Sequence, residues 1–167
     1  VYKRQIQGSA RSNGDTGKIV NYLATTNGID VIDLNTKTIG HYDYNYANAD
    51  DDFIGLFTEI ITNYDTIIFA TPVYWYSMSG IMKVFFDRIS DIIRIHKDLG
   101  RQIRRKNMVM ISTSNSNDLV EGFNMPFVQS ANYLGMTYLG DIHAWVEDDR
   151  IPEDVKTKID NFSVRLK

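Results

Sequence analysis

The sequence predicts an α/β protein: a three-layer sandwich whose five-stranded parallel sheet, strand order 2-1-3-4-5, has helices on both faces. Strand-like and helix-like hydrophobic patterns alternate along all 167 residues, as is typical of a parallel sheet with crossover helices. Residues 66–70 form a short apolar run of the kind found in central strands buried on both faces. The order 2-1-3-4-5 is the simplest one that keeps every crossover right-handed.

The elements are expected in a regular succession. The expected strands lie at residues 1–6, 30–34, 66–70, 107–112 and 136–146. The expected helices lie at residues 16–26, 53–63, 79–95, 119–134 and 152–166. In the first three helices the apolar residues recur three and four positions apart, which gives each helix one face for the core. Asn27-Gly28 ends the first helix, Met125-Pro126 disturbs the fourth, and Pro152 begins the fifth.

Length and composition narrow the class of protein. A chain of 167 residues suits one domain, residues 1–167, with a full core. No run is long enough for a membrane span, and no signal-peptide pattern is present. Val1 opens directly into strand pattern without an initiator Met, so we expect a few residues before it. A formal charge of −3 makes nucleic acid an unexpected partner.

The residue types that are missing also exclude several kinds of chemistry. The chain has no cysteine, which removes disulfides, thiolate metal sites, iron–sulfur ligation and cysteine nucleophiles. The lack of cysteine fits a cytoplasmic location. The three histidines, His41, His96 and His143, form no ligand-spaced pair, so no metal site is expected.

The polar stretch after the first strand, Gly8-Ser9-Ala10-Arg11-Ser12-Asn13-Gly14-Asp15-Thr16, is the strongest functional signal. A strand, a tight loop and a helix start direct backbone N–H groups and the helix dipole at one point, which favours a dianion. Arg11 adds a charged fork suited to phosphate oxygens. The sequence Gly-Lys-Ser/Thr that ends a P-loop does not occur, and the glycines do not have the Gly-x-Gly-x-x-Gly spacing of dinucleotide-binding loops. We therefore expect a ligand with a single terminal phosphate. The alternative is a polar turn with a Thr or Asp helix cap.

Three loops are expected to meet at the carboxyl ends of the strands: residues 8–16, 71–79 and 112–118. The second contains three consecutive aromatic residues, 74–76, which can form a wall against a planar ring. Its alternative is a packed loop with a dimer contact. The third is a run of hydroxyl and amide residues that can hydrogen-bond the polar edge of a heterocycle. Taken alone, it is equally well explained as a flexible turn that ends in a helix cap at Asp118.

These motifs together resemble those of the flavodoxin-like NAD(P)H-dependent FMN reductase family. The resemblance rests on Gly8-Ser9-x-Arg11 with Gly14 and Thr16, and on Thr71-Pro72-Val73-Tyr74-Trp75-x-Ser77-Met78-Ser79 followed by Lys83 and Asp87-Arg88. It covers the whole chain and implies a flavodoxin-like fold. It also implies that the first loop holds the FMN phosphate, that the second lines the isoalloxazine, and that the third packs beside the ring. The candidate cofactor-binding residues are Ser9, Arg11, Ser12, Asn13, Asp15, Thr16, Pro72, Val73, Tyr74, Trp75, Ser112, Ser114 and Asn115.

The resemblance implies an oxidoreductase in which FMN takes hydride from NADPH or NADH. The electrons would pass to a small acceptor such as a quinone, free flavin, azo or nitro compound, with ping-pong kinetics. The flavin carries the chemistry, so no catalytic side chain is expected. Backbone N–H groups of the second and third loops would stabilise the charge of the reduced ring. A homodimer or homotetramer is expected, whose second copy could close the site. Relatives with a cysteine-bound iron–sulfur centre are excluded by the absence of cysteine.

Two other functions remain open on the sequence. The first is a flavodoxin-type electron carrier that binds FMN but does not react with NAD(P)H, although such carriers are typically more acidic than −3. The second is a phosphate-binding or protein-interaction module without cofactor. A low-molecular-weight phosphatase is excluded, because its loop needs a cysteine nucleophile.

Several charged residues are predicted to be structural. Lys83, Asp87 and Arg88 share one helix, and we expect them to support the fold or a subunit contact. The acidic run Asp50–Asp52 suits the start of the next helix. The basic run Arg101–Lys106 is interpreted as a solvated face, with a contact to a nicotinamide dinucleotide phosphate as the minority alternative.

Overall fold

The structure, a computed structural model, describes residues 2–166 and confirms the predicted sheet. Five parallel strands are hydrogen-bonded in the order β2-β1-β3-β4-β5. The strands are β1 (Lys3–Gln7), β2 (Asp30–Asp33), β3 (Thr66–Pro72), β4 (Asn107–Ser114) and β5 (Thr137–Trp145). The helices are α1 (Asp15–Asn27), α2 (Asp52–Asn63), α3 (Gly80–Arg94), α4 (Lys97–Ile103), α5 (Met125–Leu134) and α6 (Glu153–Ser163). Short 3-10 turns follow β2 at Leu34–Thr36 and α6 at Val164–Leu166.

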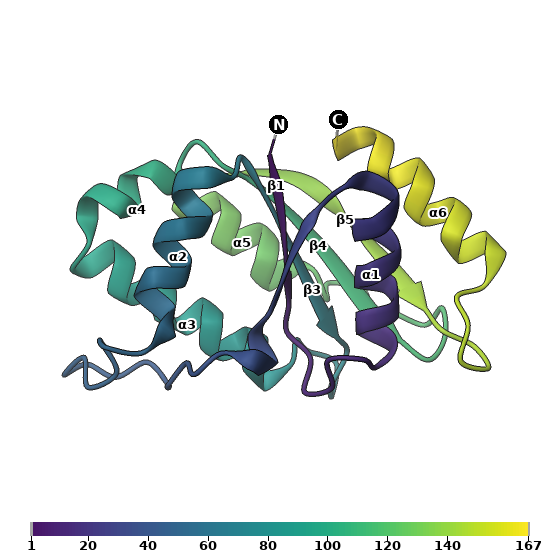
Figure 1. Ribbon diagram of the computed structural model, residues 1–167, viewed down its shortest axis with the longest axis horizontal. Helices are drawn as coiled ribbons and strands as arrows, with labels where there is room; N and C mark the ends of the chain where they lie inside the picture. The colour runs from purple at the N-terminus through teal and green to yellow at the C-terminus, as the bar shows by residue number, and fades with distance from the viewer. Residues whose placement is uncertain (1, 167) are drawn as a thin grey trace.

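Helices cover both faces of the sheet, so the molecule has three layers (Figure 1). α1 and α6 pack on one face, whereas α2, α3 and α5 pack on the other. Side chains of the central strands alternate between the two cores: Phe69 and Met110 face α3 and α5, while Ile68 and Ile111 face α1 and α6. β3 is buried along its whole length, as the apolar run predicted. These buried side chains hold the strand ends in fixed positions, because packed interiors deform little.

The fourth strand and the helix after it differ from the prediction. β4 extends to Ser114, because residues 112–114 continue the pairing with β5. The helix predicted at 119–134 begins only at Met125. Pro126 lies in its first turn, where a residue without an N–H is tolerated, whereas inside a longer helix it would remove a hydrogen bond. The loop between β4 and α5 is therefore longer than expected.

The fold also contains a sixth helix, α4, that the sequence did not predict. It has only seven residues with Gly100 in its middle, too few for a repeating apolar pattern. The basic run Arg101–Lys106 lies in α4 and in the turn before β4, at the amino ends of the strands. The loops at the carboxyl ends are at the opposite edge of the sheet (Figure 1), so a contact of this run with a nucleotide bound there is not supported. The predicted first strand began at Val1, which lies outside the described residues.

A buried ion cluster attaches α3 to the loop before α2. Arg88 is 1% exposed, and its guanidinium bonds Asp51 at 2.5 Å and Asp91 at 2.6 Å. The Asp51 carboxylate also accepts hydrogen bonds from the backbone N–H groups of Phe53 (2.9 Å) and Gly40 (2.8 Å). Burial alone would raise the pKa of Asp51, but these donors, Arg88 first, outweigh it and lower the pKa below its usual value.

The charged helix residues have the structural roles that the sequence predicted. Asp51 is the N-cap of α2, as expected for the acidic run. Lys83 and Asp87 form an ion pair of 2.6 Å along α3. Within residues 2–166, no helix is both long and apolar enough to cross a membrane.

Candidate cofactor site at the carboxyl edge of the sheet

The first loop joins β1 to α1 and is fixed to two neighbouring elements. The Gly8 N–H donates to the Ala70 carbonyl (2.8 Å), and the Gly8 carbonyl accepts from Ser79 Oγ (2.5 Å). A side chain at Gly8 would meet Met82 at 2.8 Å, so this close approach requires glycine. Ser9 is buried, and its hydroxyl accepts from the Arg11 N–H at 3.3 Å. These contacts attach the start of the loop to β3 and to the N-cap of α3.

The N-terminus of α1 points into this loop without a side-chain cap. Gly14 is the N-cap residue and has no side chain to bond the first N–H groups of the helix. Gly17 in the first turn lies so close to the loop that a Cβ there would be 2.2 Å from the Ser12 carbonyl oxygen. Free N–H groups and the positive end of a helix dipole form a site suited to an anion.

The second loop forms a tight turn that presents two aromatic side chains to solvent. Tyr74 and Ser77 exchange backbone hydrogen bonds of 2.9 and 3.0 Å across it. Its central residues, Trp75 (φ 48°) and Tyr76 (φ 63°), both have left-handed backbone conformations, which favour Asn and Gly. Trp75 is 94% exposed and Tyr76 is 71% exposed. The turn thus combines strained backbone with exposed apolar surface, a combination that is characteristic of functional sites.

The third loop begins where β4 ends, beside the second loop. The Val73 N–H donates to the Thr113 carbonyl at 2.8 Å. Thr113 is 2% exposed, and its hydroxyl has no hydrogen-bond partner among the described residues. An unpaired buried hydroxyl is costly, so a polar ligand atom would be a natural partner. Sequence reasoning missed Thr113, because its residue type alone does not show that the hydroxyl is unpaired.

The three loops enclose a cavity of about 310 Å³, which we call the three-loop cavity. Its lining residues are Ser9, Arg11, Gly14, Asp15, Thr16, Pro72, Val73, Tyr74, Thr113, Ser114 and Asn115. Nine of the predicted cofactor-binding residues are among them. Four are not: Ser12, Asn13, Trp75 and Ser112. Ser12 instead bonds Asn35 through its hydroxyl at 3.2 Å, and Ser112 is fully buried inside the sheet.

Trp75 lines a second cavity of about 360 Å³, which adjoins the first. We call this the turn-side cavity. It shares Val73, Ser114 and Asn115 with the three-loop cavity, and Trp75, Tyr76 and the loop after β4 complete it. The two cavities are therefore neighbours at the carboxyl edge of the sheet.

The charges near the three-loop cavity are of both signs. Among the described residues, Arg11 is the only cation that lines it, and Asp15 is the only anion. Lys18 pairs with Asp15 at 3.3 Å and with Asp149 on the loop after β5. The hydrogen bond to Asp149 raises the pKa of Lys18, so Lys18 stays cationic beside the first turn of α1. Arg11 therefore supplies the positive charge that an anion in the cavity would contact.

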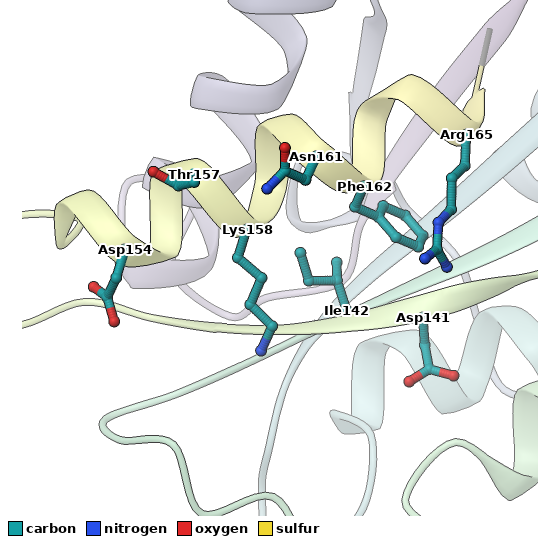
Figure 2. A pocket seen from close by; sticks show the side chains of 8 residues that line it. All are labelled: Asp141, Ile142, Asp154, Thr157, Lys158, Asn161, Phe162 and Arg165. Atoms are coloured by element: carbon teal, nitrogen blue, oxygen red, sulfur yellow. The ribbon is translucent and has the colours of Figure 1, made fainter.

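A separate cavity of about 500 Å³ lies between β5 and α6 (Figure 2). It shares no lining residue with the two cavities above. Asp141, Asp154, Lys158 and Arg165 give it two charges of each sign, so no ligand charge is favoured. Among residues 2–166 there is no group of three or more His, Cys, Asp or Glu that could hold a metal ion.

Comparisons with known proteins point to one family. Residues 5–150 match the sequence profile of the NADPH-dependent FMN reductases. YwqN of Bacillus subtilis, described as a candidate NAD(P)H-dependent FMN-containing oxidoreductase, is 26% identical over 147 residues, which are 81% of this chain and 80% of that protein.

Two solved structures share the fold. One is the Trp repressor binding protein of Bacillus subtilis, with a TM-score of 0.74, 24% identity, and coverage of 99% of this chain and 97% of that one. The other is the general stress protein 14 of Treponema denticola in complex with FMN, with a TM-score of 0.68, 13% identity, and coverage of 99% and 96%. At these identities the likeness establishes the flavodoxin-like fold.

Proposed function

Because the chain belongs to the NADPH-dependent FMN reductase family, we propose that the three-loop cavity binds FMN and that the turn-side cavity receives the nicotinamide donor and the electron acceptor in turn. The proposal rests on one observation above all. The uncapped N-terminus of α1 and Arg11 line the same cavity as an unpaired buried hydroxyl, that of Thr113. A site suited to an anion and an unpaired hydrogen-bonding group therefore line one cavity, as the binding of a flavin with a terminal phosphate requires.

The residues present fit FMN. The first loop and the first turn of α1 would hold the phosphate through backbone N–H groups, with Arg11 as its charged partner. Pro72, Val73 and Tyr74 would line the isoalloxazine, and Thr113 with Asn115 would bond its polar edge. FMN supplies the hydride chemistry when bound, so the protein's part is position and electrostatics. No side chain is assigned as a general acid or base.

The turn-side cavity supports a planar substrate. Trp75 and Tyr76 provide aromatic faces, and the cavity adjoins the three-loop cavity at Val73, so a second ring would lie next to the flavin. NADPH or NADH would be the donor. The acceptor would be a small planar molecule such as a quinone, a free flavin, or an azo or nitro compound. A single slot used by donor and acceptor in turn predicts ping-pong kinetics.

We also propose that a second copy of the chain covers part of this edge, as a homodimer or homotetramer. The exposed Trp75 and Tyr76 support this, since adjacent exposed aromatic side chains form a contiguous apolar patch, which is typical of contact sites. Sedimentation of the wild type beside a Trp75→Ser/Tyr76→Ser variant measures it. A larger species for the wild type that the variant loses is the expected result, and equal monomers would contradict this part.

The phosphate site can be tested by comparing FMN with riboflavin, which lacks the phosphate. We expect FMN to bind at least about tenfold more tightly, because charge-assisted hydrogen bonds contribute about 1.5–3 kcal/mol. The Arg11→Met variant should lose part of that difference while its riboflavin affinity stays the same. Quenching of flavin fluorescence measures both affinities. Equal binding of FMN and riboflavin by the wild type would overturn the phosphate assignment.

A further inference from the structure

His143 is a buried histidine that connects the sheet to the third loop. It lies on β5 and is 6% exposed, and it does not line the three-loop cavity. Its Nδ1 is 2.9 Å from Ser112 Oγ on β4, and its Nε2 is 2.9 Å from the Ser116 carbonyl oxygen. Nε2 is also 3.1 Å from Ser114 Oγ. One ring nitrogen therefore contacts the core, and the other contacts the loop.

The partners determine which nitrogen carries the proton. A carbonyl oxygen can only accept, so Nε2 must donate to Ser116. When the ring carries one proton, Nδ1 accepts from the Ser112 hydroxyl. The Ser114 hydroxyl also donates to the Ser116 carbonyl, at 2.8 Å. The turn at residues 114–116 is thus closed on itself. Besides the backbone pairing of Ser114 with Trp145, one imidazole N–H attaches it to β5.

The two partners of His143 differ in what they do. Ser112 is fully buried in the sheet and lines neither cavity. Ser116 lines the turn-side cavity, and Ser114 lines both cavities. The Nδ1 bond therefore belongs to the core, whereas the Nε2 bond sets the position of the loop that borders the ligand sites. Lys158 of α6 donates to the backbone carbonyl of His143 at 2.8 Å and attaches α6 to this part of β5.

We propose that His143 is a positioning residue for FMN: its Nε2–H holds residues 114–116 in the conformation that borders the flavin, without contact to the cofactor. The inference rests on the function proposed above. A loop that is already ordered loses less conformational entropy when a ligand binds. Loss of this one bond should weaken FMN binding, although His143 lies outside the site.

Two conservative variants test the hydrogen bonds of the two ring nitrogens separately. His143→Gln places an amide N–H at about the position of Nε2 and keeps the loop bond, but it leaves the Ser112 hydroxyl unpaired in the core. His143→Asn places an amide oxygen at about the position of Nδ1 and keeps the core bond, but it releases Ser116. The released carbonyl still accepts from Ser114 and can reach water, because Ser116 is exposed. Each variant is the matched control for the other.

The expected results therefore run in opposite directions. In a fluorescence titration, the Asn variant should bind FMN about 3- to 10-fold more weakly than the wild type, the range for one hydrogen bond. The Gln variant should stay within about twofold. In urea unfolding of the apoprotein, the Gln variant should be the less stable of the two, because an unpaired buried hydroxyl costs more than an exposed carbonyl. A residue that only supports the fold would make the FMN affinity follow the stability.

Amide hydrogen exchange of the apoprotein provides a readout that does not depend on flavin. Exchange at residues 114–118 should be about 3- to 10-fold faster in the Asn variant and unchanged in the Gln variant. Equal exchange in both, or FMN affinities that follow apoprotein stability, would overturn the role of His143. If the two variants differ in exchange as expected but the wild type binds no FMN, the proposed function is refuted. The attachment of the loop by His143 is then still supported.

Discussion

The aromatic turn after β3 provides a test in which stability and function should change in opposite directions. We consider a double substitution, Trp75→Asn with Tyr76→Gly, which introduces the pair that this turn type favours. A left-handed conformation costs a residue other than Gly, Asn or Asp about 1–2 kcal/mol, so relief at two positions is worth about 2–4 kcal/mol. The greater conformational freedom of glycine in the unfolded chain lowers the stability by about 0.5–1 kcal/mol. The net expected gain is about 1–3.5 kcal/mol.

Thermal unfolding of the apoprotein measures this gain. For a chain of this size, 1 kcal/mol shifts Tm by about 2–4 °C, so Tm should rise by at least about 2 °C. The matched control is Trp75→Ala with Tyr76→Ala, which removes the same rings but keeps a Cβ at both strained positions. It should show no comparable rise, because both side chains are exposed and contribute little to the core.

Both double variants should lose the aromatic wall equally. Stacking on an aromatic ring contributes about 0.5–1.5 kcal/mol, so KM for a planar acceptor should rise about 2- to 10-fold in each. Steady-state assays with a quinone check this value. The reasoning would be refuted if the Asn-Gly variant were no more stable than the Ala-Ala variant, or if both kept the wild-type KM.

Three further predictions follow from buried groups. Arg88→Met should destabilise the protein by about 3–5 kcal/mol in urea unfolding, because the buried carboxylates of Asp51 and Asp91 would lose their cationic partner. The folded-state pKa of Asp51 is lowered. The stability that its carboxylate contributes is therefore complete above its unfolded pKa of about 3.9 and is lost as the pH falls through the lower folded value. Asp51→Asn should make the loss of stability with falling pH less steep. Thr113→Val should leave the apoprotein equally or more stable but weaken FMN binding about 3- to 10-fold.

Each of these has a clear opposing result. A loss of less than about 1 kcal/mol in Arg88→Met would mean that the ion cluster is not needed to attach the loop before α2. An acid limb that is equally steep with and without the Asp51 carboxylate would place the titrating group elsewhere. Wild-type FMN affinity in Thr113→Val would show that this hydroxyl has no ligand partner.

Much of the architecture could be predicted because periodicity reports burial directly. The fully buried run in β3 and the apolar face of α3 place both elements within a residue or two of their observed bounds. The missed element, α4, is one short helix whose pattern has no room to repeat. The late start of α5 at Met125 depends on the position of one proline relative to the first turn, and a sequence pattern locates such a boundary only loosely.

The candidate site was predictable where function depends on residue type and loop position. The residue types of Gly14, Arg11 and Thr16 are informative by themselves, because a phosphate site needs glycine, a cation and the start of a helix. Ser112 and Ser114 are the same residue type two positions apart, yet Ser112 is buried in the sheet and Ser114 lines the three-loop cavity. The end of β4 decides between them. The role inferred for His143 depends on partners 27 and 31 residues away in sequence, which no local pattern contains.

The most direct test of the account is anaerobic mixing of the FMN-loaded protein with NADPH or NADH while the flavin absorbance is recorded. The protein is expected to bind FMN, and at least one of the two nicotinamides should remove the visible absorbance of the bound flavin within one turnover. Bound FMN that neither nicotinamide bleaches would contradict the reductase and favour an electron carrier without NAD(P)H activity.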